Sequence, residues 1–134
     1  MQFLNRLQST ALLLLRVGAG TIFFTHGWTK LAHASGTMHM FTGMGFPGWV
    51  GVAIGALETA GGLLLVLGLF TRVFALLLFI EMCVAIFGVH WKQVAWWNVK
   101  GYELPLACAA ISLALAAFGP GVVSMDRAVL KGRA

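Results

Sequence analysis

Four long apolar stretches follow one another along the chain, each bordered by charged or turn-forming residues. They cover Thr10–Leu31, Gly48–Phe70, Val73–Val89 and Tyr102–Phe118. A membrane-spanning helix needs about 17–25 such residues, and a helix is the only open-ended structure that pairs all its backbone polar groups in lipid. The pattern therefore predicts an all-α fold with four transmembrane helices in a single domain, residues 1–134.

The connections between these stretches differ in length. The short segment LFTRV joins the second stretch to the third, so these helices are expected to form an antiparallel hairpin. The first connection, HASGTMHMFTGMGFPGW, alternates methionine and phenylalanine with glycine, histidine and threonine. We expect it to lie in the membrane interface, partly as a helix, with methionines that pack rather than bind metal. Pro47 suits the start of the second helix, and Pro120 with Gly121 ends the fourth.

Composition supports a membrane protein. Hydrophobic residues make up 60% of the chain and charged residues only 10%, whereas soluble domains carry about 25% charged residues. The net charge of +5 comes from basic residues that are scattered along the borders of the apolar stretches. That distribution fits membrane topology rather than a nucleic-acid-binding patch. Arg16 interrupts the first apolar run, which favours a membrane span over a cleaved signal peptide.

Loop charges predict the orientation. One side of the membrane has the larger share of basic residues, namely Arg6, Arg72, Arg127, Lys131 and Arg133, against Lys30, Lys92 and Lys100 on the other. The positive-inside rule therefore places both termini in the cytoplasm. The tryptophans are all expected at the outer interface, where amphipathic rings gather: Trp28, Trp49, Trp91, Trp96 and Trp97.

Each predicted helix has a face on which an ionisable residue accompanies mostly small residues at intervals of three and four. The positions are Arg16, Gly20, Phe23, Gly27 and Lys30; Gly51, Gly55, Glu58 and Gly62; Leu78, Glu81, Ala85 and Gly88; and Glu103, Ala107, Ala110, Ala114 and Ala117. Small residues mark faces where membrane helices approach closely, and this spacing favours left-handed packing. The charges are therefore expected to point into a left-handed four-helix bundle.

Depth along the helices, counted at about 1.5 Å per residue, groups three of these charges. Arg16 is expected to reach one or both of Glu58 and Glu81, forming an intramembrane charge cluster nearer the cytoplasmic side. One arginine against two glutamates leaves an acid in excess, so either one carboxyl is protonated or another positive group completes the site. Such a cluster could have a purely structural role and fix the register of the helices. Alternatively, it could have a functional role, as intramembrane ionisable residues commonly do.

The chain resembles the DoxX family of small four-helix bacterial inner-membrane proteins. The resemblance rests on LLLLRVGAGTIFFTHGWTKL, GMGFPGWVGVAIGALETAGGLLLVLGLFTR and GYELPLACAAISLALAAFGPGVVSMDR, and covers residues 10–127. It implies a location in the cytoplasmic membrane and an association with respiratory sulfur or redox chemistry. Relatives form the membrane part of thiosulfate:quinone oxidoreductase, and others are linked to a complex with superoxide dismutase and a sulfurtransferase.

Quinone chemistry gives the outer polar residues a role. Reduction of a quinone consumes two electrons and two protons, so its oxygens need hydrogen-bond donors and a proton source, which histidine and carboxyl groups supply. His26, Lys30 and Glu103 have the right types at a suitable depth near the outer surface. Trp28 and Tyr102 are expected as neighbours of the quinone ring.

Electron transfer needs help from outside this chain. The sequence has no flavin fingerprint, no iron–sulfur spacing and no vicinal thiols, and Cys83 and Cys108 are expected to be packing thiols. A haem between His26 and His90 is disfavoured, because His90 follows Glu81 by nine residues and should lie on the opposite side of an ideal helix. No intrinsic cofactor or metal site is predicted, so a partner must carry the redox centre.

Three functions remain in view, and catalytic residues are not assigned. The first is a membrane subunit of a quinone-linked oxidoreductase, for sulfur, thiosulfate or oxidative-stress chemistry, which binds quinone and docks a soluble or peripheral redox partner. The second is a non-catalytic membrane scaffold whose buried charges only pair helices. The third is a transporter of small solutes or protons, which would need an oligomer because four short spans form little pore.

Overall fold

The computed structural model describes residues 1–93, 95 and 97–130, and every regular element in that part of the chain is a helix. The elements are α1 (Gln2–Ala32), α2 (Ala34–Gly43), α3 (Gly48–Leu67), α4 (Thr71–Val84), the π-helix η1 (Ala85–His90), α5 (Trp91–Gln93), the 3₁₀-helix η2 (Val99–Gly101), α6 (Glu103–Phe118) and α7 (Met125–Leu130). The predicted all-α class is therefore confirmed. Trp96, Lys131 and Arg133, which entered the predictions above, lie outside the described residues.

The ends of α3 follow from its sequence. The helix begins at Gly48, as predicted, directly after Pro47, whose ring restricts the backbone there. It ends before Gly68, which adopts the left-handed conformation with φ 71°. Glycine reaches that conformation without the steric penalty of a Cβ atom, so it closes the helix three residues before the predicted end at Phe70.

Three continuous helical stretches are long and apolar enough to cross a membrane: Gln2–Ala32, Gly48–Leu67 and Thr71–Gln93. The fourth apolar helix, α6, has 16 residues, which corresponds to about 24 Å of helix against a hydrocarbon core of about 30 Å. Four crossings, a left-handed bundle and cytoplasmic termini therefore stay predictions. What the structure supports is an all-helical protein with three helices of spanning length.

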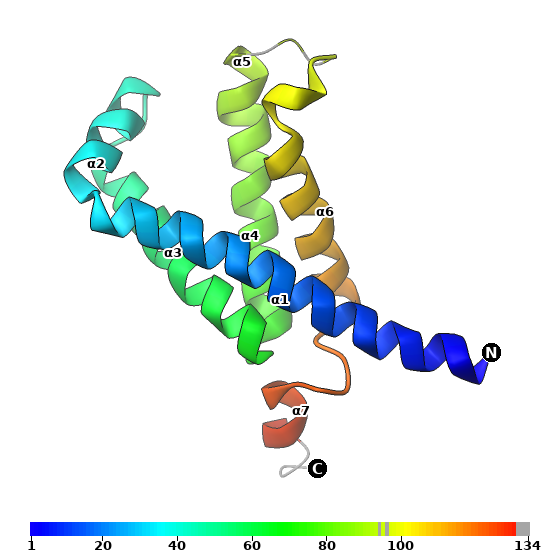
Figure 1. Ribbon diagram of the computed structural model, residues 1–134. Coiled ribbons are helices and arrows are strands. Elements are labelled where there is room, and N and C mark those ends of the chain that lie inside the picture. The colour runs from blue at the N-terminus through cyan, green and yellow to red at the C-terminus, as the bar shows by residue number, and fades with distance from the viewer. Residues whose placement is uncertain (94, 96, 131–134) are drawn as a thin grey trace.

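The long helices associate in two pairs. α1 packs mainly on α3, and α4 packs mainly on α6; Figure 1 shows the first pair lying obliquely across the second. Glycines let α1 and α3 approach closely, since a Cβ atom on Gly62 would lie 2.5 Å from the Gly20 carbonyl oxygen. The small-residue faces predicted for α1 and α3 are buried in this interface, with Gly20, Gly27 and Gly55 among them.

The face predicted for α6 is wrong. The predicted stripe is largely exposed: Glu103, Ala107, Ala110 and Ala117 are exposed and Ala114 is half-buried. Cys108, Ala109, Ser112 and Leu115 are buried instead. The alanine-rich pattern could not distinguish these faces, because the neighbouring face of α6 is also small or apolar. The fully buried Leu78 and Leu115, on α4 and α6, belong to one hydrophobic core.

Candidate ligand-binding cavity

A cavity of about 710 Å³ lies at the end of the molecule where α1 finishes and α3 and α6 begin. α2, the upper part of α4, and η1 complete its wall. The wall is mainly apolar, with a minority of polar side chains, namely His26, Lys30, Glu58, Glu81, His90, Gln93, Lys100 and Glu103. Small-molecule sites have this character and fall in this range of volumes, so the cavity is the candidate functional site.

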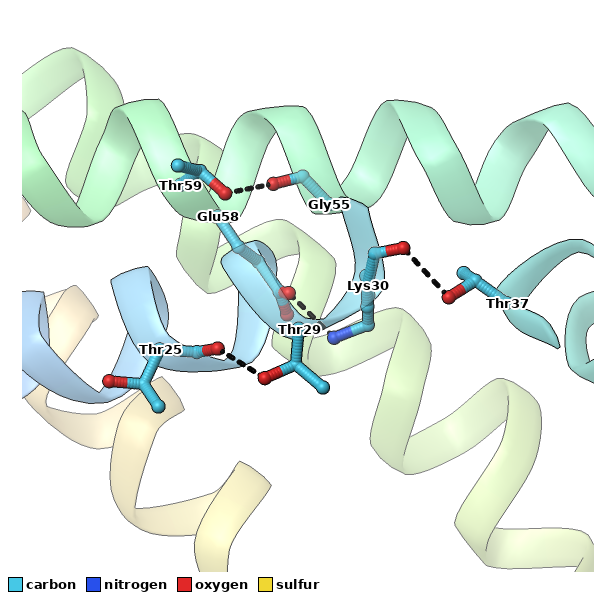
Figure 2. A network of polar contacts seen from close by, with 7 residues as sticks. All are labelled: Thr25, Thr29, Lys30, Thr37, Gly55, Glu58 and Thr59. Atoms are coloured by element: carbon cyan, nitrogen blue, oxygen red, sulfur yellow. Dashed lines mark hydrogen bonds and ion pairs between the residues drawn. The ribbon is translucent and has the colours of Figure 1, made fainter. Parts of the chain in front are cut away.

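An ion pair occupies the wall formed by α1 and α3. Lys30 Nζ donates to Glu58 Oε2 at 2.6 Å, with only 19% and 4% of the two side chains exposed. Figure 2 shows the two side chains pointing toward each other from neighbouring helices. The backbone around Lys30 is tied down as well, because its carbonyl oxygen accepts a hydrogen bond of 2.9 Å from Thr37 Oγ1 of α2. The Lys30 ammonium group is therefore held at the cavity wall.

Glu81 adds a second carboxyl group to this site. It is 9% exposed and adjoins Glu58, and it lies within electrostatic reach of Lys30. Its Oε2 atom is buried without a hydrogen-bond partner among the described residues. Two carboxyl groups against one ammonium group leave one negative charge unbalanced, and an unpaired charge in such surroundings is costly. A proton, or a hydrogen-bond donor from a ligand, would resolve the imbalance.

Arg16 does not belong to this cluster, contrary to the prediction from depth. It is 2% exposed, and its guanidinium group donates to four backbone carbonyls. These are Leu65 at 3.1 Å, Val66 at 3.3 Å, and Pro120 and Val123 at 2.6 Å each. Arg16 therefore joins the open carbonyls at the end of α3 to the segment that follows α6. Its role in the structure is to hold three segments together.

The direction of helical side chains explains why Lys30, and not Arg16, pairs with Glu58. Each Cα–Cβ bond in an α-helix tilts toward the N-terminus of the helix. Lys30, at the C-terminal end of α1, therefore extends back along α1 to Glu58, whereas Arg16 extends away from Glu58 toward the end of α3. Counting depth between Cα atoms ignores this tilt. The correct cluster is Lys30–Glu58–Glu81.

Asp126 completes the arrangement at the Arg16 end. Its two carboxylate oxygens accept hydrogen bonds from the backbone amides of Phe70 at 2.7 Å and Thr71 at 2.9 Å, which caps the start of α4. The same carboxylate also attracts the Arg16 guanidinium group electrostatically. This pattern was not recognised in the sequence, since Asp126 lies far along the chain from the helix that it caps.

The predicted quinone-binding residues divide into two sets. His26, Lys30 and Glu103 line the cavity, with His26 and Glu103 exposed. Trp28 does not line it: this ring is 59% exposed and stacks on Phe24, with 6.3 Å between centroids. Tyr102 also lies outside the lining, and packs partly buried against the hydrophobic core at the start of α6. The structure therefore brings together the polar candidates and leaves out the two aromatic ones.

His90 is a lining residue that the sequence reasoning excluded. Residues Ala85–His90 form a π-helix, which bonds each carbonyl to an amide five residues on and so turns less per residue than an α-helix. His90 consequently shares the cavity with Glu81 instead of lying on the opposite side. The expectation from an ideal α-helix is wrong here. A π-helix has no reliable signature in a single sequence.

Metal and thiol chemistry find little support in the part of the chain that the structure describes. No group of three or more His, Cys, Asp or Glu side chains there could hold a metal ion. Cys83 and Cys108 are both free, and Cys108 is buried in the cavity wall.

A family model decides the relationship of this chain to known proteins. The model for DoxX matches residues 11–91. This chain belongs to the DoxX family. The match includes α3 and α4 whole, most of α1, and the π-helix, and it ends before α6.

Curated relatives of this DoxX-family chain extend over nearly its whole length. "Putative oxidoreductase CatD" of Bacillus subtilis is 34% identical over 130 residues, which cover 97% of this chain and 95% of the relative. "Inner membrane protein YqjF" of Escherichia coli is 30% identical over 128 residues, covering 96% and 98%. "Inner membrane protein YphA", also of E. coli, is 31% identical over 128 residues, covering 87% and 88%. No solved structure matches.

These relatives and the long apolar helices identify the chain as a membrane protein of the bacterial inner membrane. The DoxX family thus accounts for the apolar composition. It leaves open what the polar cavity binds.

Proposed function

We propose that this DoxX-family protein is the quinone-binding membrane subunit of an oxidoreductase system. The observation that carries the proposal is the apolar cavity of about 710 Å³ into which the Lys30–Glu58–Glu81 cluster faces. Its volume suits a substituted aromatic ring. The relative named "Putative oxidoreductase CatD" supports the redox assignment for this family.

The polar groups match the needs of a quinone head. A quinone becomes a quinol when it gains two electrons and two protons, which form one O–H bond on each of its oxygens. Lys30 is a fixed donor for one quinone oxygen, and His26 and Glu103 supply further polar contacts on the wall. The excess carboxyl group of the Glu58–Glu81 pair can hold one of the protons near the ring.

The electrons come from outside this chain in this proposal. The described residues offer no metal cluster, and the sequence carries no flavin or iron–sulfur motif. A soluble or peripheral redox protein, of the sulfur, thiosulfate or oxidative-stress type that the family resemblance suggests, docks on the subunit and delivers them. We propose that the termini face the cytoplasm, which places the cavity in the outer half of the membrane.

Mass spectrometry of lipids that copurify with the protein tests the proposal. Wild-type protein in mild detergent is expected to retain a quinone, and the Lys30→Met and His26→Ala variants are expected to lose most of it. Trp28→Phe serves as the control because Trp28 lies outside the cavity. A wild-type preparation that takes up no quinone, even when quinone is added in excess, would rule the proposal out.

A scaffold without catalytic function is the second candidate, and Arg16 favours it. That residue shows a fully buried charge whose hydrogen bonds all join segments of the chain. If the Lys30–Glu58 pair has the same purely structural role, replacing both residues with apolar ones leaves cellular function intact wherever the protein folds. A transporter instead predicts solute or proton flux into liposomes, abolished by the same replacement.

A further inference from the structure

We propose that His90 is the hydrogen-bond acceptor for a quinol hydroxyl group, and that the π-helix Ala85–His90 exists in this fold to bring it into the cavity. The inference rests on the proposed function and extends it, because it names the residue of the cavity wall that binds the reduced form of the ligand. Lys30 donates and therefore suits the carbonyl of a quinone, whereas His90 accepts and suits the hydroxyl of a quinol.

The position of His90 depends on the π-helix. An α-helix continued from α4 would turn about 100° per residue and carry His90 to the side opposite Glu81, nine residues before it. The lower turn per residue across η1 leaves both side chains in the cavity wall. π-helical segments are rare and frequently coincide with functional sites, and this one ends on the residue that it repositions.

The tautomer of His90 follows from its hydrogen bond. Nδ1 lies 2.8 Å from the carbonyl oxygen of Ala85, the first residue of the π-helix. A carbonyl oxygen can only accept, so Nδ1 carries the proton, and Nε2 of the neutral ring has a free lone pair. The ring is thereby oriented by the same segment that places it. Nε2 is an acceptor for an O–H group, and a quinone oxygen, which has no hydrogen, offers it nothing.

His26 and Glu103 also line the cavity and can accept hydrogen bonds, but both are exposed, whereas His90 is half-buried and oriented by its own helix. Lys30 and Lys100 can only donate, and Glu58 is already engaged by Lys30. Glu81 adjoins Glu58 on the charged side of the wall. His90 and the nearby Gln93 are on the η1–α5 side. A ring held between the two sides meets a donor on one and an acceptor on the other.

Titration calorimetry in detergent, under anaerobic conditions, tests the inference with a short-tailed benzoquinone and its quinol. His90→Ala is expected to weaken quinol binding about tenfold, as the loss of one well-placed hydrogen bond does, and to leave quinone binding nearly unchanged. His90→Gln is expected to restore part of the quinol affinity because its amide oxygen can accept. His39→Ala, on the exposed side of α2, is the control that changes neither.

A deletion tests the π-helix itself. Removal of Phe87, which is 63% exposed, is expected to convert the segment to α-helix. His90 then follows Glu81 by eight residues, which is about 80° around the helix axis at about 100° per residue, so it stays on the cavity side and quinol binding should be kept. A quinol-specific loss in this variant would contradict a purely positional role for the π-helix. Phe87→Ala keeps the length of the segment and is the matched control, expected to bind like wild type. If His90→Ala does not fold, His90→Gln decides the matter, because it is expected to lower the affinity for quinol only in part and to leave the affinity for quinone nearly unchanged.

The outcomes separate this inference from the proposed function. Wild-type protein that binds neither form defeats the quinone proposal and this inference with it. Wild-type protein that binds both forms, with His90→Ala lowering the two affinities equally or not at all, overturns the inference alone. A haem absorption band in the purified protein would also overturn it, since His90 would then be an axial ligand.

Discussion

The ammonium group of Lys30 and the carboxylate of Glu58 lie 2.6 Å apart across the interface of α1 and α3. Close approach of the two helices makes this pair reachable: a Cβ atom on Gly27 would meet the backbone nitrogen of Thr59 at 2.4 Å. With Glu58 paired and Glu81 beside it without a cation of its own, the charge balance of these two carboxyl groups depends on Lys30. The stability of the protein is therefore expected to depend on Lys30 as well.

Removing Lys30 is expected to destabilise the protein strongly. Lys30→Met leaves two buried carboxyl groups without a cation, and breaking a buried pair in this way costs about 3–5 kcal/mol. The double variant Lys30→Met/Glu58→Leu is expected to recover part of that loss, because Glu81 is then the one carboxyl group of the cluster left beside the methionine, with no second carboxyl group next to it. Denaturation in detergent micelles, followed by circular dichroism, measures the free energies of unfolding. Lys92→Met, at an exposed position, is the control, and a double variant no more stable than Lys30→Met would contradict the prediction.

The glycine contact between α1 and α3 predicts a sharp position dependence. Gly62→Ala would put its Cβ atom 2.5 Å from the Gly20 carbonyl oxygen, which is backbone and cannot rotate away. The helices must then separate, at a cost of about 1–3 kcal/mol. Gly18→Ala meets nothing within 4 Å and gains up to about 1 kcal/mol of helix propensity. The midpoint of thermal unfolding should fall for Gly62→Ala and rise for Gly18→Ala. Equal shifts of the two midpoints would show that α1 and α3 do not pack as described.

Arg16→Lys is expected to lower stability without affecting the cavity. An ammonium group cannot span four carbonyl oxygens that a planar guanidinium reaches, and the groups left unpaired cost about 2–3 kcal/mol. Quinone retention at a temperature where the variant is folded should equal that of wild type. Arg6→Lys, at an exposed position, controls for the substitution itself. A selective loss of quinone in folded Arg16→Lys would return Arg16 to the ligand site.

Cysteine labelling in intact cells tests the proposed orientation. In a variant lacking Cys83 and Cys108, a cysteine introduced at Gly36 of α2 should react with an impermeant maleimide from the periplasm. A cysteine at Ala128 of α7 should react only after the cells are permeabilised. The reason is the excess of basic residues at the end that holds both termini. The reverse pattern of labelling would place the termini in the periplasm and the cavity in the inner half of the membrane.

Much of the fold could be read from local patterns. The start of α3 at Gly48 and the end of α6 at Phe118 agree with the predicted limits. α1 is longer than predicted, since it begins at Gln2 rather than near Thr10: polar residues at a helix end are tolerated where the helix leaves the apolar region. The site was predicted in part, because His26, Lys30 and Glu103 do line one cavity, whereas Trp28 and Tyr102 do not.

The sequence by itself determined that this protein lies in lipid and that it is built from helices. An apolar composition and long stretches with few charges require a lipid environment, and backbone groups in lipid require helices. Small residues at helical spacing mark the interface of α1 and α3. Tertiary structure alone decided the partners. Whether a buried cation meets a carboxylate or a carbonyl depends on the direction of its side chain and on which helix ends beside it, as Lys30 and Arg16 show. Whether His90 enters the cavity depends on a change of helical twist across six residues, and such a change is settled by packing between distant segments rather than by local sequence.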